Sequence, residues 1–259
     1  MAVHGSRTTD AKFRRWVREN IDDVGLNISR GLIDGISHIN KFGRNIDVDT
    51  GSETVWEGGG IINYSATANI SHIVSSSASD TFNVTVVGLD TNWNEVEQTV
   101  ALAGTDGQAL TTSLRRCYRM WNASATAAVG TVQCGVSDTT SSFSAANLRA
   151  QITIGYEQSL MAVYTVPANK TAYLVDWFAE IDKASGAGAV DFSIFAREDG
   201  GVFRIKEQQG TQTTGSSVLN RTYTVYPSFP GKTDIEIRAE GSTTNFDISA
   251  GFDLILVDN

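Results

Sequence analysis

The densest run of side chains that could do chemistry lies between residues 47 and 53, where carboxylates alternate with small residues. Asp47, Asp49 and Glu53 would supply oxygen ligands of the kind that calcium prefers in loop sites. In a calcium loop that begins at Asp47, however, the fifth and twelfth positions are Gly51 and Gly58, which carry no side-chain ligand. The run is more typical of a solvent-exposed acidic turn, whose carboxylates bond to neighbouring backbone groups. We expect the turn, and we predict no metal and no cofactor.

Other catalytic patterns are incomplete in this sequence. Three histidines, His4, His38 and His72, have no second ligand at the spacing of a zinc site. The residues around Ser37 lack the second glycine of a nucleophile elbow, and no glycine-rich phosphate loop is followed by a lysine. A glycosidase needs two opposed carboxylates, and 29 acidic residues leave the choice of a pair open. We predict that the chain is not an enzyme.

Four tryptophans that follow the predicted helical arm allow two interpretations. Trp56, Trp93, Trp121 and Trp177 could line a platform for sugar rings. In a β protein with many aliphatic strands, such residues are more often found in the core or at interfaces. We favour the second interpretation, and we expect Trp56 to take part in contacts between subunits.

Composition sets limits on the partners of the chain. It has 259 residues, 41% of them hydrophobic, and a formal net charge of -9, which argues against nucleic acid as a partner. No apolar run is long enough to predict a membrane span, and the first residues lack the apolar core of a signal peptide. We therefore expect folding in a reducing cytoplasm. Cys117 and Cys134 are expected to be buried free thiols, with a disulfide across adjacent strands as the alternative.

The elements that must position these residues begin with a predicted helical arm over residues 9–24. Its apolar stripe consists of Phe13, Trp16, Val17, Ile21 and Val24, at helical spacing. Thr8 or Thr9 would cap the helix and Gly25 would end it. Four basic residues lie on the arm beside or opposite the stripe, namely Lys12, Arg14, Arg15 and Arg18. Residues 26–40 are expected to form an extended linker or one short strand.

After residue 40 the pattern changes to alternating β-branched residues with frequent turn formers, which predicts strands. The clearest hairpin joins residues 82–89 to 95–102, and a second joins 190–197 to 202–207. Short strands with turns every eight to twelve residues are typical of a sandwich or jelly roll. We predict an all-β fold of two tandem antiparallel β-sandwich or jelly-roll-like domains. The predicted boundaries are 1–40 for the arm and linker, 41–154 for the first sandwich and 155–259 for the second.

One segment resembles a known group of proteins. Residues 41–60 read KFGRNIDVDTGSETVWEGGG, and tailed-bacteriophage structural proteins carry a similar Gly-Arg-Asn-x-Asp-Val-Asp-Thr run before Trp-Asp/Glu-Gly-Gly-Gly. The resemblance extends in the same order to about residue 135, through Ile73–Asp80, Val87–Asp90, Asn94–Val96, Thr99–Leu102 and Arg116–Arg119. It implies a component of the virus particle and no catalytic residue.

The resemblance leads to an expected function. We expect a capsid decoration or cement protein, found in the virion and made in the host cytoplasm, whose partners are itself, as a homotrimer, and the major capsid protein or another virion protein. A tail or fibre-base component and a carbohydrate-binding module for the host surface are the alternatives. The residues expected to make oligomer or capsid contacts are Phe13, Trp16, Val17, Ile21, Arg14, Arg15, Arg18 and Trp56.

Overall fold

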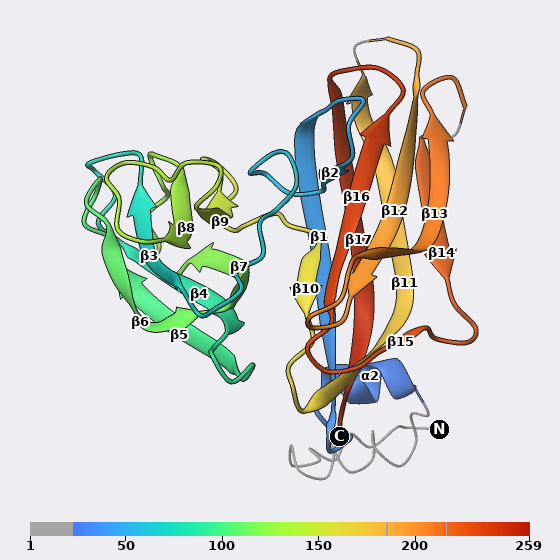
Figure 1. Cartoon of the computed structure of the whole chain (residues 1–259), viewed down its shortest axis with the longest axis horizontal. Coiled ribbons are helices and arrows are strands. Elements are labelled where there is room, and N and C mark those ends of the chain that lie inside the picture. The colour runs from blue at the N-terminus through green and yellow to red at the C-terminus, as the bar shows by residue number, and fades with distance from the viewer. Residues whose placement is uncertain (1–22, 185, 216) are drawn as a thin grey trace, which may run out of the picture.

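A computed structural model of the chain describes residues 23–184, 186–215 and 217–259. These residues form a large lobe and a small lobe that lie side by side (Figure 1). The sheets in both lobes are antiparallel, so the predicted all-β, sandwich-like fold is confirmed. The C-terminus lies at the base of the large lobe, near the short helix that begins the described chain.

Sheet A forms one layer of the large lobe. The main order of its strands is β1 (Ile36–Val48), β17 (Phe246–Asp258), β11 (Lys170–Ala184) and β14 (Val218–Thr222), and β15 (Ser228–Phe229) also pairs with β11. The alternation of residues along β17 shows why one face of this sheet is buried. Its alternate positions from Phe246 to Leu256 are buried, whereas most positions between them are partly exposed. In the strand order of sheet A, β1 and β17, the first and last strands of the described chain, are neighbours.

Sheet B forms the second layer. Its main order is β10 (Val163–Thr165), β16 (Asp234–Gly241), β12 (Ala189–Arg197) and β13 (Arg204–Gln212), and β2 (Glu53–Thr54) also pairs with β16. The predicted hairpin across residues 198–201 is confirmed, because β12 pairs with β13 from Ala189–Gln212 to Ala196–Arg204.

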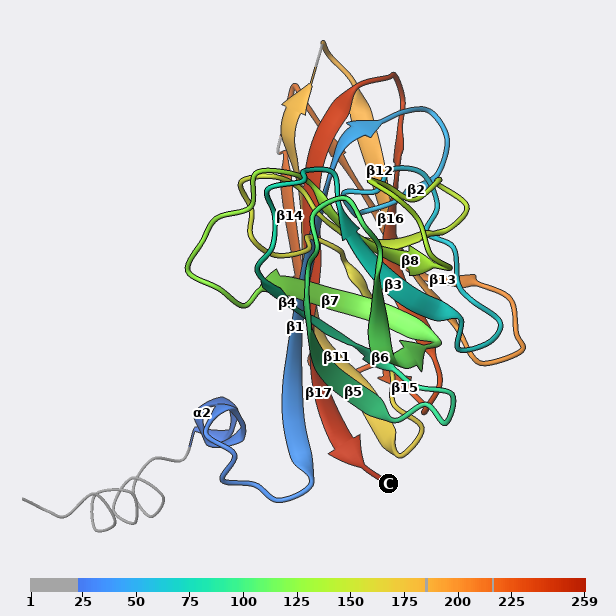
Figure 2. The same cartoon turned by 90° about the vertical axis from the view of Figure 1, so that its left-hand side faces the viewer.

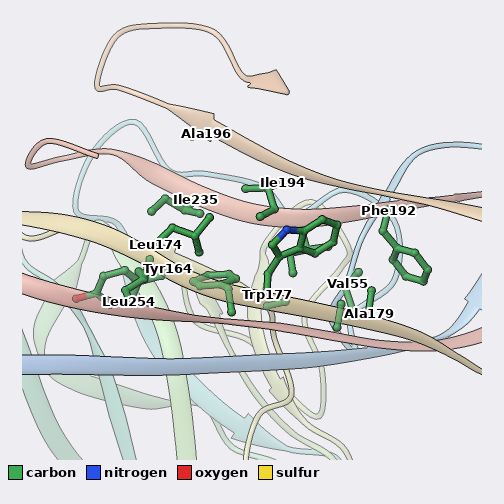
Figure 3. Packing of buried hydrophobic residues seen from close by; sticks show 14 of the residues in the cluster. Val55, Tyr164, Leu174, Trp177, Ala179, Phe192, Ile194, Ala196, Ile235 and Leu254 are labelled. Carbon is green, nitrogen blue, oxygen red and sulfur yellow. The ribbon is translucent and has the colours of Figure 1, made fainter. Parts of the chain in front are cut away.

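The core of the large lobe lies between the two sheets. Trp177 of β11 is fully buried at its centre, among aliphatic and aromatic side chains from both layers (Figure 3). Leu174 and Leu254 come from sheet A, whereas Ile194 and Ile235 come from sheet B. Each such side chain contributes about 1.5–3 kcal/mol when it is removed from water, so this layer accounts for much of the stability of the lobe.

The small lobe is a second, smaller sandwich. Its four-stranded sheet has the order β6 (Gln108–Leu114), β3 (Ile70–Ser75), β8 (Val132–Val136) and β9 (Leu148–Ile152). Its three-stranded sheet has the order β5 (Glu95–Ala101), β4 (Asn83–Leu89) and β7 (Arg116–Asn122). The predicted hairpin near residues 82–102 is confirmed by the pairing of β4 with β5. Its turn is closed by the Asp90 carboxylate, which accepts hydrogen bonds from the amides of Asn92 and Asn94.

The division of the chain between the two lobes differs from the tandem arrangement that we expected. Strand β1 pairs with β17 and β2 pairs with β16, so residues 36–54 belong to the sheets of the C-terminal sandwich and not to those of the first one. The chain then leaves for the small lobe and returns at β10. The boundary expected at residue 41 falls inside β1. Periodicity along the chain cannot reveal this arrangement, because the partner strand is at the opposite end of the sequence.

The start of the described chain also differs from expectation. Helix α2 (Val24–Ser29) is capped by Asp23, whose carboxylate accepts a hydrogen bond from the Leu26 amide at 2.9 Å. Gly25 therefore lies inside a helix and does not end one. The expected linker over residues 26–40 contains most of α2 and the first residues of β1. Within the described ranges, no helix is long and apolar enough to cross a membrane.

The small lobe closes an open edge of the large sandwich. The three-stranded sheet faces the large lobe, and its residues Val87, Leu89 and Tyr118 belong to the core of that lobe. Figure 2 shows this sheet in front of the large lobe, across the direction of β1. Because β1 and β10 are edge strands of sheets A and B, the small lobe covers apolar side chains that a free sandwich would expose.

Candidate functional site

The residues predicted to make subunit contacts fall into two groups. Those of the arm lie outside the described residues, namely Phe13, Trp16, Val17, Ile21, Arg14, Arg15 and Arg18. Trp56 is described and is only 3% exposed. Its indole N–H points to the carbonyl oxygens of Gly59 and Gly60, at 3.1 and 3.2 Å. Trp56 thus packs within its own chain, in place of the surface contact that we expected.

The glycines after Trp56 are explained by this packing. A β-carbon at Gly58 would lie 2.3 Å from the indole ring of Trp56, and the φ angles of Gly59 and Gly60 are 69° and 58°. Side chains larger than hydrogen are disfavoured at all three positions, either by the ring or by the left-handed backbone. The Trp-Glu-Gly-Gly-Gly run is therefore a turn that closes on its own tryptophan.

Carboxylates between residues 47 and 53 hold the crossover, the stretch in which the chain passes from β1 to β2 and on to the small lobe. Glu53 accepts hydrogen bonds from the Asn45 side-chain amide at 3.1 Å, from the Asp49 backbone amide at 3.2 Å and from the Gly60 backbone amide at 3.0 Å. Asp49 in turn accepts a hydrogen bond from the Asn245 amide. The described residues hold no group of three or more His, Cys, Asp or Glu side chains that could bind a metal ion. Glu53 and Asp49 therefore serve as acceptors for backbone and side-chain amide donors.

Gly43 brings two separate parts of the chain into contact. A β-carbon at this position would lie 2.2 Å from the Val55 carbonyl oxygen and 2.3 Å from the Ala162 amide nitrogen. Those two groups form a hydrogen bond of 2.9 Å, so the return from the small lobe crosses directly over β1. The segment 41–60 is thus the structural junction at which the chain passes from sheet A to sheet B and then to the small lobe.

A buried ion cluster joins the lobes. Asp234 of β16 accepts hydrogen bonds from Arg116 of the small lobe, at 2.7 Å to Nε and 3.0 Å to Nη2. It also accepts one from Arg197 at 2.6 Å and one from the Thr165 hydroxyl at 2.7 Å. Charge-assisted bonds with this geometry are among the strongest in proteins, so the cluster holds one relative position of the two lobes.

Aromatic rings alternate with these arginines along the junction. In order, the ladder consists of Trp93, Arg116, Tyr64, Arg197, Phe203, Arg238 and Phe195, with guanidinium-to-ring-centroid distances from 4.3 to 5.1 Å. Glu236, which is fully buried beside Arg238, accepts hydrogen bonds from Thr54 and Tyr64. Burial raises the pKa of Glu236 above its ordinary value, and Arg238 opposes that shift. We name this group of residues the inter-lobe ladder.

Lys41 lies at the same interface without a carboxylate partner among its described contacts. Its ammonium group donates to the Tyr118 carbonyl oxygen and lies 5.9 Å from the Tyr118 ring centroid. Burial, with a smaller contribution from Arg119, holds the pKa of Lys41 well below its ordinary value. Protonation of Lys41 at this buried position therefore opposes folding.

The two cysteines lie in opposite sheets of the small lobe. Cys117 of β7 and Cys134 of β8 are buried and free, and a hydrogen bond joins their thiols. This bond, together with burial, raises the pKa of Cys134 well above its ordinary value. Both thiols therefore act as small core residues that contact each other.

The tryptophans do not form a sugar platform. Trp56 and Trp177 belong to separate cores, and Trp93 lies under Arg115 and Arg116. Trp121 is partly buried and packs against the core of the large lobe. A stacking platform needs neighbouring exposed rings, which these four residues do not provide. The interpretation of the tryptophans as core and interface residues is confirmed for Trp56, Trp93 and Trp177.

A groove of about 430 Å³ opens beside the crossover. Its apolar side chains are Ile46 of β1 and Ile154 and Tyr156 of the return from the small lobe, which are 61%, 53% and 41% exposed. Asp47 and Glu57 also line it. We call it the crossover groove. Three large apolar side chains exposed around one hollow are typical of a binding surface rather than of scattered surface residues.

The groove adjoins an acidic part of the outer face of sheet A. Arg44, which lines the groove, lies between two carboxylates, 3.3 Å from Asp247 and 3.9 Å from Asp182. Farther along the same face, Asp253 lies near Asp176, and burial followed by the charge of Asp253 raises the pKa of Asp176. This part of the face has more carboxylates than cations, which favours a basic partner.

Comparisons with known proteins return distant structural similarities. No protein-family model and no curated protein matches the sequence. Among solved structures, the chain is similar to that of the infectious bursal disease virus VP2 subviral particle, with 12% identity, a TM-score of 0.22, and coverage of 88% of this chain and 73% of that one. It is also similar to a putative secreted protein from Parabacteroides distasonis, with 9% identity, a TM-score of 0.15, and coverage of 88% and 90%.

Proposed function

We propose that this chain is a non-enzymatic structural component of a bacteriophage particle, specifically a capsid decoration or cement protein. The observation that carries the proposal is the segment 41–60, whose residues resemble a run in tailed-bacteriophage structural proteins. In this fold the same segment builds the junction of sheet A, sheet B and the small lobe.

Individual residues of the pattern have physical reasons to occur together. Gly43 admits the backbone of Val55, and Asn45 donates to both the Glu53 carboxylate and the Thr54 carbonyl oxygen. Trp56 fills a core position that Gly58 leaves free for its ring. A sequence that contains this set has the means to form the same crossover. The resemblance therefore concerns the framework of the protein and supports a shared structural role.

Attachment to a shell would use repeated contacts of modest area. We propose that the protein assembles with itself as a homotrimer and binds the major capsid protein in the virion, after synthesis in the host cytoplasm. Closed three-fold symmetry suits the local three-fold positions of a capsid. The inter-lobe ladder supports this role because it holds the two lobes in one relative position. A rigid protein of this kind can connect neighbouring shell subunits.

The number of copies per purified particle tests the proposal. Quantitative mass spectrometry against the major capsid protein should give hundreds of copies for a cement protein. About a dozen copies or fewer would instead support a tail or fibre-base component. Absence of the chain from purified particles would refute a role in the particle. A hydrolytic activity that disappears on substitution of one carboxylate would refute the non-enzymatic part.

A further inference from the structure

We propose that the crossover groove receives the basic amphipathic segment of residues 9–21 from a second copy of this chain. This inference deepens the proposed function, on which it rests, by naming the partner of one surface. The groove presents Ile46, Ile154 and Tyr156 to solvent, although Arg44 donates a hydrogen bond to the Tyr156 hydroxyl and its guanidinium group lies 5.9 Å from the centroid of that ring.

The sequence of the segment matches the apolar part of the groove. Phe13, Trp16, Val17 and Ile21 recur at helical spacing, so a helix would present them along one side. A helix of this length is marginal in water by itself and needs a surface against which to pack its apolar side. An amphipathic helix in an apolar groove is a recurrent mode of recognition, with anchors at this spacing.

The charges of the two surfaces are also complementary. Residues 9–21 carry two acids, Asp10 and Glu19, and four cations that are concentrated between residues 12 and 18, which read KFRRWVR. The groove is lined by Asp47 and Glu57, and Asp182 and Asp247 lie beyond Arg44 on the adjoining face. Burial raises the pKa of Glu57. A guanidinium group of the bound segment would favour the ionised form of this carboxyl group and would be attracted to it. Opposite charges at the rim favour this partner and fix its orientation.

The length of a helical arm favours another copy as the source of the segment. Helix α2 lies beside the end of β1 at which that strand starts (Figure 2), whereas the groove lies at Arg44 and beyond. From Ile36 to Arg44 the strand covers about 26 Å, at about 3.3 Å per residue. A helix that ends next to Asp23 would place Phe13 only about 15 Å away, at about 1.5 Å per residue. If the arm is helical up to Asp23, its apolar stripe would therefore fall short of the groove of its own chain, whereas the arm of a neighbouring copy would not be restricted in this way.

Such a contact has consequences for symmetry. The segment of one copy and the groove of the next are different surfaces, so the interface is heterologous. Interfaces of this type close into a ring when the rotation allows it and otherwise grow as open filaments. In a ring of three copies, the arm of each copy would occupy the groove of the next one, in agreement with the proposed trimer.

Site-directed crosslinking of full-length chains tests the inference. One chain carries Val17→Cys, a second carries Ile154→Cys, and the two are mixed and mildly oxidised. The native thiols of Cys117 and Cys134 are buried and do not compete. We expect a disulfide between position 17 of one chain and position 154 of the other, identified by peptide mass spectrometry. Val225→Cys is the matched control in place of Ile154→Cys, because Val225 is 84% exposed but lies outside the groove, and it should not crosslink.

A second measurement follows self-association directly. Ile154→Asp should weaken it at least about tenfold in sedimentation experiments, whereas Val225→Asp should leave it unchanged. Unaltered assembly of Ile154→Asp would overturn the inference. So would a chain carrying both Val17→Cys and Ile154→Cys in which the disulfide forms only within one chain. Hundreds of copies in the particle without the intermolecular disulfide would also overturn it, while leaving the proposed function in place.

Discussion

Arg116 and Asp234 are 118 positions apart in the sequence and form a two-point ion pair between the lobes, at 2.7 and 3.0 Å. The arginine belongs to β7 of the small lobe, and the carboxylate, which is 1% exposed, belongs to β16 of the large lobe. Arg197 and Thr165 complete the set of donors to this carboxylate. The pair lies within the inter-lobe ladder and links two sandwiches that each have their own core.

Replacing this arginine should destabilise the protein strongly. Arg116→Met retains much of the side-chain volume but removes two charge-assisted bonds to a buried carboxylate. We expect a loss of about 3 kcal/mol in the free energy of unfolding, measured by urea denaturation. Arg204→Met, at an exposed position of β13, is the control and should change the stability by no more than about 0.5 kcal/mol. Equal effects of the two substitutions would show that the ion pair does not join the lobes.

Gly43→Ala should be among the most damaging small changes in the chain. The added methyl group would meet backbone atoms of Val55 and Ala162, which no side-chain rotation can move away. The expected loss is about 3 kcal/mol or failure to fold, measured by thermal unfolding. Gly51→Ala adds the same methyl group a short distance along the segment, where no atom lies within 4 Å, and should be nearly neutral. Similar stability of both variants would contradict the close crossing at Gly43.

Lys41 should make stability depend on pH in the alkaline range. Its pKa is lower in the folded than in the unfolded chain, so the unfolded chain binds more protons. Stability due to this group is therefore present in full above the unfolded pKa of about 10.4 and falls as the pH decreases toward the folded pKa. Lys41→Met should remove this contribution, which denaturation of both proteins at several pH values would measure. An unchanged pH dependence in Lys41→Met would contradict the assignment.

The two contacting thiols should be reduced in the native protein. Unfolding in an alkylating reagent without reductant should label both Cys117 and Cys134, as measured by intact mass. In the folded protein labelling should be slow, because both side chains are buried. An unlabelled chain that is two hydrogens lighter would instead demonstrate a disulfide between the sheets of the small lobe.

Removal of residues 1–22 should abolish assembly and leave both lobes folded. The deletion ends before Asp23 and so retains the cap of α2. Circular dichroism should show an unchanged β spectrum, while sedimentation should show a monomer. Normal incorporation of the shortened chain into particles would show that the arm is not needed for attachment.

Local patterns predicted the strands well where both strands of a pair lie close together in the sequence. The hairpin of β4 and β5 and that of β12 and β13 have the expected positions, because alternation and turn residues are local signals. Strand β1 was missed over much of its length, since its exposed and buried positions depend on β17 at the other end of the chain. The same cause misplaced the first domain boundary.

The candidate site was less predictable than the fold. The carboxylate run of the Lys41–Gly60 segment was expected to form a turn with local backbone bonds, and Glu53 does accept such bonds. Trp56, which we expected at a contact between subunits, instead packs within its own chain. The crossover groove combines Ile46 with Ile154, and only the return of the chain from the small lobe brings these residues together. The ladder could not be predicted from spacing, because Trp93 and Arg116 are separated by two strands and their further partners Arg197 and Asp234 belong to the other lobe.

The position of β17 between β1 and β11 also orders the events of biosynthesis. The small lobe is contiguous in the sequence, so it can fold while the ribosome is still making the rest of the chain. Sheet A, in contrast, is incomplete until the final strand has left the exit tunnel, because β1 must wait for its neighbour. A product that lacks only β17 would leave β1 without its partner and open one edge of β11, which still pairs with β14 and β15, so incomplete copies would be exposed to proteases.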